Sequence, residues 1–155
     1  MPEGGTPPSP AKCSAEMGGL LAPMLALALA APVWAEGLPD PLTGVPGDPL
    51  RGRAIMLDRG RSLCVLCHAG PFPEVPFHGD LGPSLAGVGE RLSLSELRLR
   101  LVDSRRVNPD TIMPPFGSLE GLVRVGARWK GTTILTAQEI EDVVAFLAGL
   151  KGGAE

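Results

Sequence analysis

The chain has 155 residues, which is enough for one ordinary domain. Its net charge is −3, so it lacks the basic excess that a nucleic-acid-binding surface requires. Glycine (21 residues) and proline (17) are abundant and tyrosine is absent, which indicates a protein rich in loops and poor in large aromatic core residues.

Residues 1–35 are expected to be a signal peptide. Residues 20–31 form an apolar run, LLAPMLALALAA, and the sequence VWA that ends at Ala35 is typical of a cleavage site. The run is too short for a comfortable membrane span. We therefore expect cleavage near Ala35, export to the periplasm and a mature chain without a membrane-spanning segment. An uncleaved anchor is the alternative, because Lys12 is the only basic residue before the run.

The mature chain should consist of an extended lead-in and one domain. Residues 36–47 are rich in proline and glycine, which favours an extended segment, and residues 48–155 form the domain. Asp48 followed by a proline is a typical helix start, with the aspartate as the N-cap. A helix is therefore predicted from Leu50 to about Arg59.

The sequence from Cys64 to His68 reads C-x-x-C-H, the attachment motif of a c-type haem. Each thiol can bond to the same porphyrin, and the adjacent imidazole can bind its iron. A bare C-x-x-C pair would also suit zinc or dithiol redox chemistry, but the histidine and the absence of a second cysteine pair favour haem. Cys13 precedes the expected cleavage site, so Cys64 and Cys67 would be the only thiols of the mature chain, as suits an oxidising compartment.

The residues after the motif predict a loop that passes the edge of the haem. Residues 69–80 contain three prolines and cannot form a long helix. The carbonyl of Pro83 is a candidate acceptor for the second ring nitrogen of His68, which would fix the tautomer of that ligand. Leu85 would pack on the porphyrin. An ordinary Gly-Pro turn explains the same residues equally well.

Two further helices are predicted, and each begins with a capping box. Ser93 with Glu96 starts the first, and Thr136 with Glu139 starts the last. Apolar residues recur at helical spacing in both: Leu94, Leu97, Leu101 and Val102 in the first, and Ile140, Val143, Val144, Leu147 and Leu150 in the last. A solvated face, or a docking patch for an acidic partner, is expected for the arginines of the first region: Arg98, Arg100, Arg105 and Arg106.

Met113 is the preferred candidate for the second axial ligand of the iron. Two prolines follow it, so it is not in a helix interior and its backbone is stiff. A thioether suits the iron of an electron-transfer haem, although a methionine can also simply fill a gap in a loop. His78 is the competing ligand, and Met56 is expected to pack at the haem edge. Trp129 either covers the haem or closes a small core.

These features together resemble the class I cytochrome c fold, an all-α fold of about three main helices and long loops around one covalent haem. Three longer stretches are similar to the SoxX family, the monohaem cytochrome subunit of the SoxAX complex of bacterial thiosulfate oxidation. The stretches are residues 77–85 (FHGDLGPSL), 105–116 (RRVNPDTIMPPF) and 134–147 (ILTAQEIEDVVAFL). The class I cytochrome c resemblance covers nearly all of residues 48–151, and residues 117–124 match SoxX less well.

The resemblance implies one haem c, with Cys64 and Cys67 as covalent attachments and His68 and Met113 as axial iron ligands. It also implies a function as the redox subunit of an L-cysteine S-thiosulfotransferase, which joins thiosulfate oxidatively to a cysteine of a SoxYZ-like carrier protein. One haem exchanges one electron, so a SoxA-like partner cytochrome is expected to perform the two-electron substrate chemistry. The electrons would leave through a small soluble cytochrome.

Two other functions remain open. A free-standing periplasmic monohaem cytochrome c that shuttles electrons would carry the same axial ligands but need no obligate partner. A catalytic or ligand-sensing haem protein would need an open or easily vacated sixth position, which a bound Met113 would close.

Overall fold

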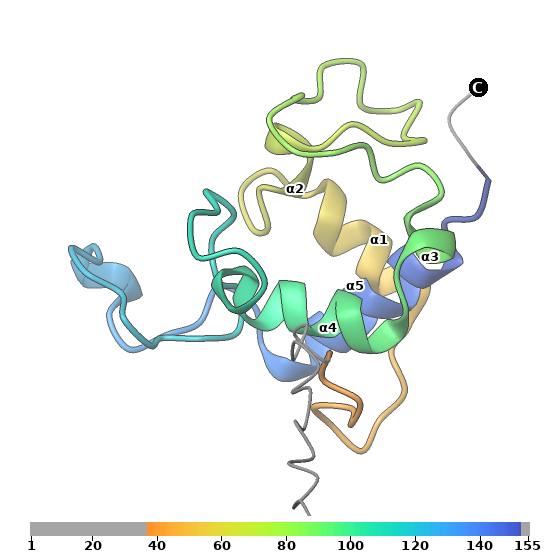
Figure 1. Ribbon diagram of the computed structural model, residues 1–155. Coiled ribbons are helices and arrows are strands. Elements are labelled where there is room, and N and C mark those ends of the chain that lie inside the picture. The colour runs from red at the N-terminus through yellow and green to blue at the C-terminus, as the bar shows by residue number, and fades with distance from the viewer. Residues whose placement is uncertain (1–36, 153–155) are drawn as a thin grey trace, which may run out of the picture. The chain divides into compact units, whose positions relative to one another are not determined.

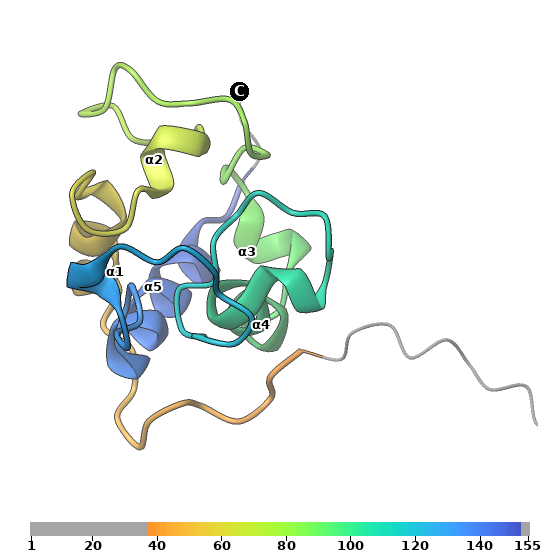
Figure 2. The same cartoon turned by 90° about the vertical axis from the view of Figure 1, so that its left-hand side faces the viewer.

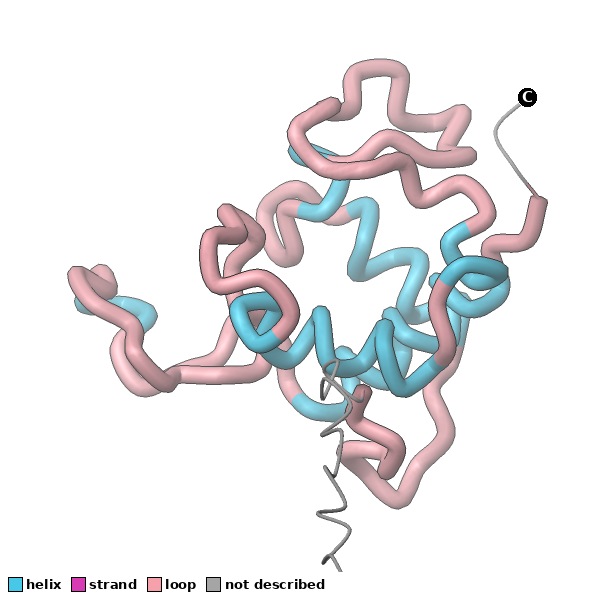
Figure 3. The backbone as a smooth tube through the Cα atoms, in the orientation of Figure 1, coloured by secondary structure: helices cyan, strands magenta, loops and turns pink. Residues whose placement is uncertain are grey.

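The computed structural model of the chain describes residues 37–152. The expected signal peptide, its cleavage site and Cys13 lie outside the described residues. The elements in chain order are α1 (Pro49–Leu57), α2 (Cys64–Cys67), α3 (Val88–Arg91), α4 (Leu94–Asp103), the 3₁₀ helices η1 (Ser104–Arg106) and η2 (Ala127–Trp129), and α5 (Ala137–Gly149). Within this range there is no β-strand, and three longer helices are joined by long loops (Figure 3). The predicted all-α fold is confirmed.

α1 begins where the sequence predicted and packs against α5 (Figure 1). The carboxylate of Asp48 caps it by accepting hydrogen bonds from the first free backbone N–H groups. The helix ends at Leu57, two residues before the predicted end. At Gly52 the two helices are so close that a methyl group there would overlap the backbone carbonyl of Asp142 on α5. The contact between the first and last helices therefore depends on glycine at position 52.

α4 and α5 both begin at the predicted capping boxes. In each, a hydroxyl accepts from the backbone N–H three residues later, and the glutamate at that position accepts from the N–H of the cap residue. The predicted apolar face of α5 is buried at Ile140, Val143, Val144 and Leu147. On α4, Leu97 and Leu101 are buried, whereas Leu94 is exposed.

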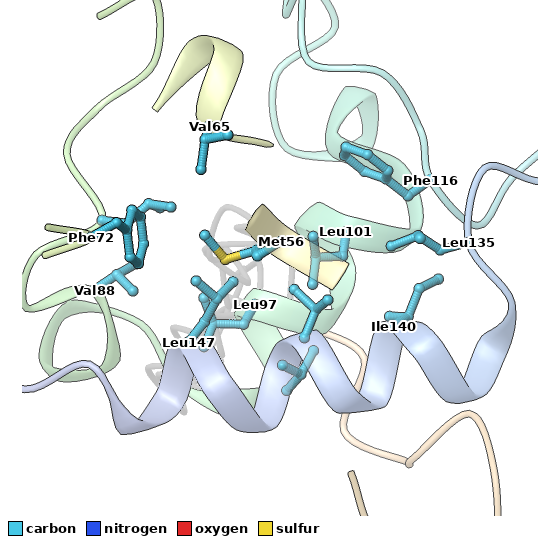
Figure 4. Packing of buried hydrophobic residues seen from close by; sticks show 13 residues of the cluster. Met56, Val65, Phe72, Val88, Leu97, Leu101, Phe116, Leu135, Ile140 and Leu147 are labelled. Atoms are coloured by element: carbon cyan, nitrogen blue, oxygen red, sulfur yellow. The ribbon is translucent and has the colours of Figure 1, made fainter. Parts of the chain in front are cut away.

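The hydrophobic core gathers side chains from all five α-helices and from several loops (Figure 4). Met56 of α1 lies between Val65 of α2 and Leu147 of α5, and all three side chains are buried. Phe116 and Leu135 join from loops that are far apart in sequence. The core therefore holds α2, the turn that carries the two cysteines, in place through Val65.

A buried ion pair joins α4, α5 and the segment 37–47. The side chain of Arg98 is only 4% exposed, and its Nε lies 2.7 Å from Oε1 of Glu141. Arg98 also donates to the carbonyl of Leu38 (2.5 Å), and Glu141 accepts from the N–H of Leu42 (2.9 Å). Burial opposes ionisation of Glu141, but these hydrogen bonds outweigh it and lower the pKa of its carboxyl.

The prediction that Arg98 lies on a solvated face is therefore wrong. Helical periodicity showed that Arg98 lies on α4, but it did not show that α5 places a carboxylate opposite that position. The segment 37–47, predicted as an extended lead-in, contains no helix or strand and is hydrogen-bonded to α4 and α5 through this pair.

Residues 119–132 form a projection that leaves the helices (Figure 1, left, and Figure 2, front). Every residue in this range is exposed, and η2 is its only helical turn. None of the helices between residues 37 and 152 is long and apolar enough to cross a membrane.

Candidate haem-attachment site

α2 is a single helical turn that presents Cys64 and Cys67 together. Residues three apart lie on one face of a helix, so both thiols point to the same side. Val65, between them, is fully buried and anchors the turn to the core. The two thiols form no disulfide within the described residues, and both are partly buried. Burial raises the pKa of the Cys64 thiol.

His68 ends this turn, and its ring is held in one orientation. Its backbone N–H donates to the carbonyl of Cys64 (2.9 Å), and its ring Nδ1 lies 2.8 Å from the carbonyl oxygen of Pro83. A carbonyl only accepts hydrogen bonds, so Nδ1 carries the proton and Nε2 presents a lone pair. A side chain at position 82 would overlap the imidazole ring, so Gly82 makes room for it. The structure thus contains the His68–Pro83 hydrogen bond, which is one of the two interpretations that the sequence allows for Pro83.

The loop that carries Pro83 runs alongside the motif. The N–H of Gly79 donates to Val65 (3.0 Å), that of Gly82 to Cys67 (2.8 Å) and that of Leu85 to Ala69 (2.8 Å). These three bonds follow one another in the same order along both segments. The loop is therefore fixed in register against the cysteine turn, at the point where its carbonyl meets His68.

Arg91 secures the other side of the same loop. Its guanidinium donates from Nη2 to the carbonyl of Ser84 (2.7 Å) and from Nη1 to that of Ala86 (2.5 Å). The two carbonyls flank Leu85, which is buried. Sequence reasoning did not identify Arg91, because nothing in the local sequence indicates that its side chain turns back toward residues 84–86.

Met113 lies on a different loop, which is attached to the end of α4. Its carbonyl accepts from the hydroxyl of Ser104 (2.7 Å), and its N–H donates to the hydroxyl of Thr111 (3.2 Å). Its side chain is partly buried and packs against the same core cluster as that of Cys64, and Leu85 belongs to that cluster. Both backbone polar groups of Met113 are therefore satisfied, and its thioether is on the core side of the loop.

The comparisons with known proteins identify the fold and the family. No protein-family model and no curated protein matches the sequence. One solved structure, the crystal structure of SoxXA from P. pantotrophus, contains a chain that is 39% identical to this one, with a TM-score of 0.69. The match covers 75% of this chain and 90% of that chain. The chain belongs to the SoxX family. The resemblance and the fold class that the sequence predicted are both confirmed.

The donor atoms of this SoxX-family chain fit a haem c better than a bare metal ion. Two free thiols on one turn are followed by an imidazole whose Nε2 is free of the Pro83 hydrogen bond. Between residues 37 and 152, no three side chains of histidine, cysteine, aspartate or glutamate gather as a metal site would require. A zinc centre, the alternative for the C-x-x-C pair, would need such a group.

Of the two remaining candidates of the sequence analysis, His78 directly precedes Gly79, which is hydrogen-bonded to the cysteine turn, and Trp129 lies on the projection. His78 is exposed on the proline-rich loop, beside a hollow that is lined by Phe72 and Val75. Trp129 lies on the projection, where it is 45% exposed and packs under the guanidinium of Arg128. Trp129 therefore does not close the core shown in Figure 4.

Proposed function

We propose that Cys64 and Cys67 hold one haem c through thioether bonds, and that His68 and Met113 are the axial ligands of its iron. Once bound, the group supplies reversible one-electron chemistry. The Pro83 carbonyl holds the proton on Nδ1 of His68, which directs Nε2 to the metal and strengthens the ligand. Ser104 and Thr111 hold the Met113 backbone, which limits the positions that its thioether can take.

We further propose that the chain is the electron-accepting subunit of an exported, periplasmic SoxAX-type L-cysteine S-thiosulfotransferase. In that reaction the sulfane sulfur of thiosulfate bonds to the cysteine sulfur of a SoxYZ-like carrier, and the S–H bond of that cysteine breaks, so that two electrons and the thiol proton are released. If His68 and Met113 both bound the iron, they would leave thiosulfate no free position on it. The substrate chemistry is therefore assigned to a SoxA-like partner cytochrome, and the electrons pass on to a small soluble cytochrome.

One observation carries this proposal: the imidazole of His68 is held by the Pro83 carbonyl directly beside two cysteines on one turn. A dithiol redox site has no need of an imidazole directed at a metal, whereas a ligand of the haem iron needs a fixed tautomer. A zinc ion would need a group of ligands that does not gather between residues 37 and 152. The similarity to a chain of SoxXA supports the choice of complex.

Replacing Met113 by alanine tests the ligand assignment. The haem should stay attached, the sixth position should open, and the reduction potential should fall because the soft thioether is lost. The measurement is the oxidised absorption spectrum together with a redox titration. Leu50→Ala, a change at a side chain that is 78% exposed on α1, should leave both unchanged. An unaltered spectrum and potential in Met113→Ala would reject this ligand and make His78 the next candidate.

The division of labour is tested by adding thiosulfate to the purified haem protein and following haem reduction. Reduction should require both the SoxA-like cytochrome and the carrier protein. Rapid reduction of this chain alone would contradict the proposed role, and efficient turnover of the partner without this chain would support the free-standing shuttle instead.

A further inference from the structure

The projection formed by residues 119–132 exposes an unusual share of apolar surface. Large apolar side chains at five of its fourteen positions are solvent-exposed: Leu119, Leu122, Val123, Val125 and Trp129. Val123 is 82% exposed, although valine is typically a core or strand residue. Clustered exposed apolar side chains of this kind mark sites where proteins associate.

The projection is firmly attached at its base. The N–H of Gly117 donates to Val102 of α4 (3.1 Å), and the N–H of Leu135 donates to Phe116 (3.0 Å), which joins the two ends of the segment. Near the start of the projection, the guanidinium of Arg105 donates to the carbonyl of Glu120 (2.8 Å). A surface that is held in place before binding loses less entropy when a partner binds.

The same surface is hollowed and basic. Leu119, Leu122 and Trp129 line a hollow whose rim includes Arg124 and Lys130. The segment 117–133 contains three cationic side chains and one carboxylate, whereas the whole chain has a net charge of −3. Its charge is thus opposite in sign to that of the rest of the chain, which favours a partner that is acidic at the point of contact.

Trp129 has the properties of a binding hot spot. The guanidinium of Arg128 lies 4.5 Å above the centre of its ring, so an aromatic and an arginine are presented together. Tryptophan and arginine are the residues that most often dominate the energy of protein interfaces. The hollow beside them is suited to an inserted apolar side chain, and Arg128 and Arg124 are suited to carboxylates around it.

We propose that the 119–132 projection is the surface through which this chain binds its partner cytochrome, and that the partner presents an apolar side chain rimmed by carboxylates. The inference rests on the proposed function, because it commits to the SoxA-like subunit as the occupant. Only Gly117 and Ser118 separate the projection from the Met113–Phe116 loop. Five residues, 114–118, therefore connect the proposed iron ligand to the surface on which the partner would sit.

The test compares surface variants of the haem-loaded chain in binding to the purified SoxA-like subunit, measured by titration calorimetry. Trp129→Ser combined with Val123→Ser should weaken binding at least tenfold. Arg128→Glu should weaken it as well, and should slow association most at low salt. Leu50→Ser is the matched control, since Leu50 is 78% exposed on α1, and its affinity should be unchanged. The haem spectrum and melting temperature of each variant confirm that it is folded.

The results separate this inference from the proposed function. If the unaltered chain binds the SoxA-like subunit and the projection variants bind equally well, the surface is wrong and the function stands. If the unaltered chain does not bind that subunit, both fail. A third result would be that the unaltered chain self-associates or binds anionic lipid vesicles. If Trp129→Ser abolishes that binding and leaves the affinity for the SoxA-like subunit unchanged, the surface belongs to another occupant and the inference is overturned.

Discussion

The loop of residues 79–85 and the projection of residues 119–132 are both irregular segments, yet they are held in opposite ways. The first is hydrogen-bonded twice to the cysteine turn and once to Ala69, and it buries Leu85. The second is attached only at its base and exposes its apolar side chains. Neither contains a helix longer than one turn.

The difference shows that irregular segments serve two purposes in this chain. Where apolar loop residues are tied to helices, they contribute to the proposed haem site. Where they are left uncovered, they are available to another protein. Four predictions test whether this contrast between an internally secured site and an outward-facing surface holds.

The largest effect is expected from removing the carboxylate of Glu141. Glu141→Leu leaves the guanidinium of Arg98 buried without its partner, which should lower the free energy of unfolding by about 3–5 kcal/mol. Denaturant unfolding of the haem-loaded protein measures this. Adding Arg98→Leu to the same chain should recover part of the loss, because no charge is then left buried. Equal stability of Glu141→Leu and the unaltered protein would show that the ion pair does not secure the helices.

A smaller effect is expected at the crossing of α1 and α5. Gly52→Ala places a methyl group against the Asp142 carbonyl, so the helices must separate, at a cost of about 1–3 kcal/mol. Gly44→Ala is the matched control, because no atom lies within 4 Å of a side chain added there. Thermal unfolding should distinguish the two, and equal melting temperatures would refute the close packing of the helices.

Acid should weaken the same crossing. Hydrogen bonds from Arg51 lower the pKa of Asp142 in the folded protein, against the opposing effect of burial. The unfolded chain then binds more protons than the folded one, so the stabilisation is complete above the ordinary aspartate pKa and is lost as pH falls through the lower folded value. Unfolding measured at a series of pH values below about 5 should show a steeper decline for the unaltered protein than for Asp142→Asn. Parallel curves would remove Asp142 as the cause.

The smallest effect is expected on the projection. Trp129→Ser should change the free energy of unfolding by no more than about 0.5 kcal/mol, because the side chain is 45% exposed and lies outside the core cluster. The same denaturant titration applies. A loss above about 1 kcal/mol would mean that Trp129 supports the fold, and the contrast between the two loops would fail.

Much of the candidate site could be predicted because it depends on residues that are adjacent in the sequence. The C-x-x-C-H motif, the capping boxes of Ser93 and Thr136 and the N-cap of Asp48 depend on neighbours within one turn of chain, where local geometry decides the structure. The sequence does not decide between a hydrogen bond from His68 to Pro83 and an ordinary Gly-Pro turn, because fifteen residues separate the partners.

Other features could not be predicted because they join distant parts of the chain. Arg98 pairs with Glu141 across 43 positions. Arg91 reaches back only five and seven residues, but local periodicity does not show that its side chain turns toward those carbonyls. The short helix α3 was also not predicted. Arginine side chains are long and flexible, so sequence spacing does not fix where their charged ends lie.

The sequence by itself predicted the three main helices, and it indicated two thiols, an imidazole and a methionine as candidate haem-binding groups. These predictions follow from residue chemistry and local periodicity. Only the tertiary structure decided that the Pro83 carbonyl faces His68, that Arg98 is inside and that Trp129 is outside. Those outcomes depend on which surfaces meet when the helices pack, and burial is a property of that packing rather than of any single stretch of chain.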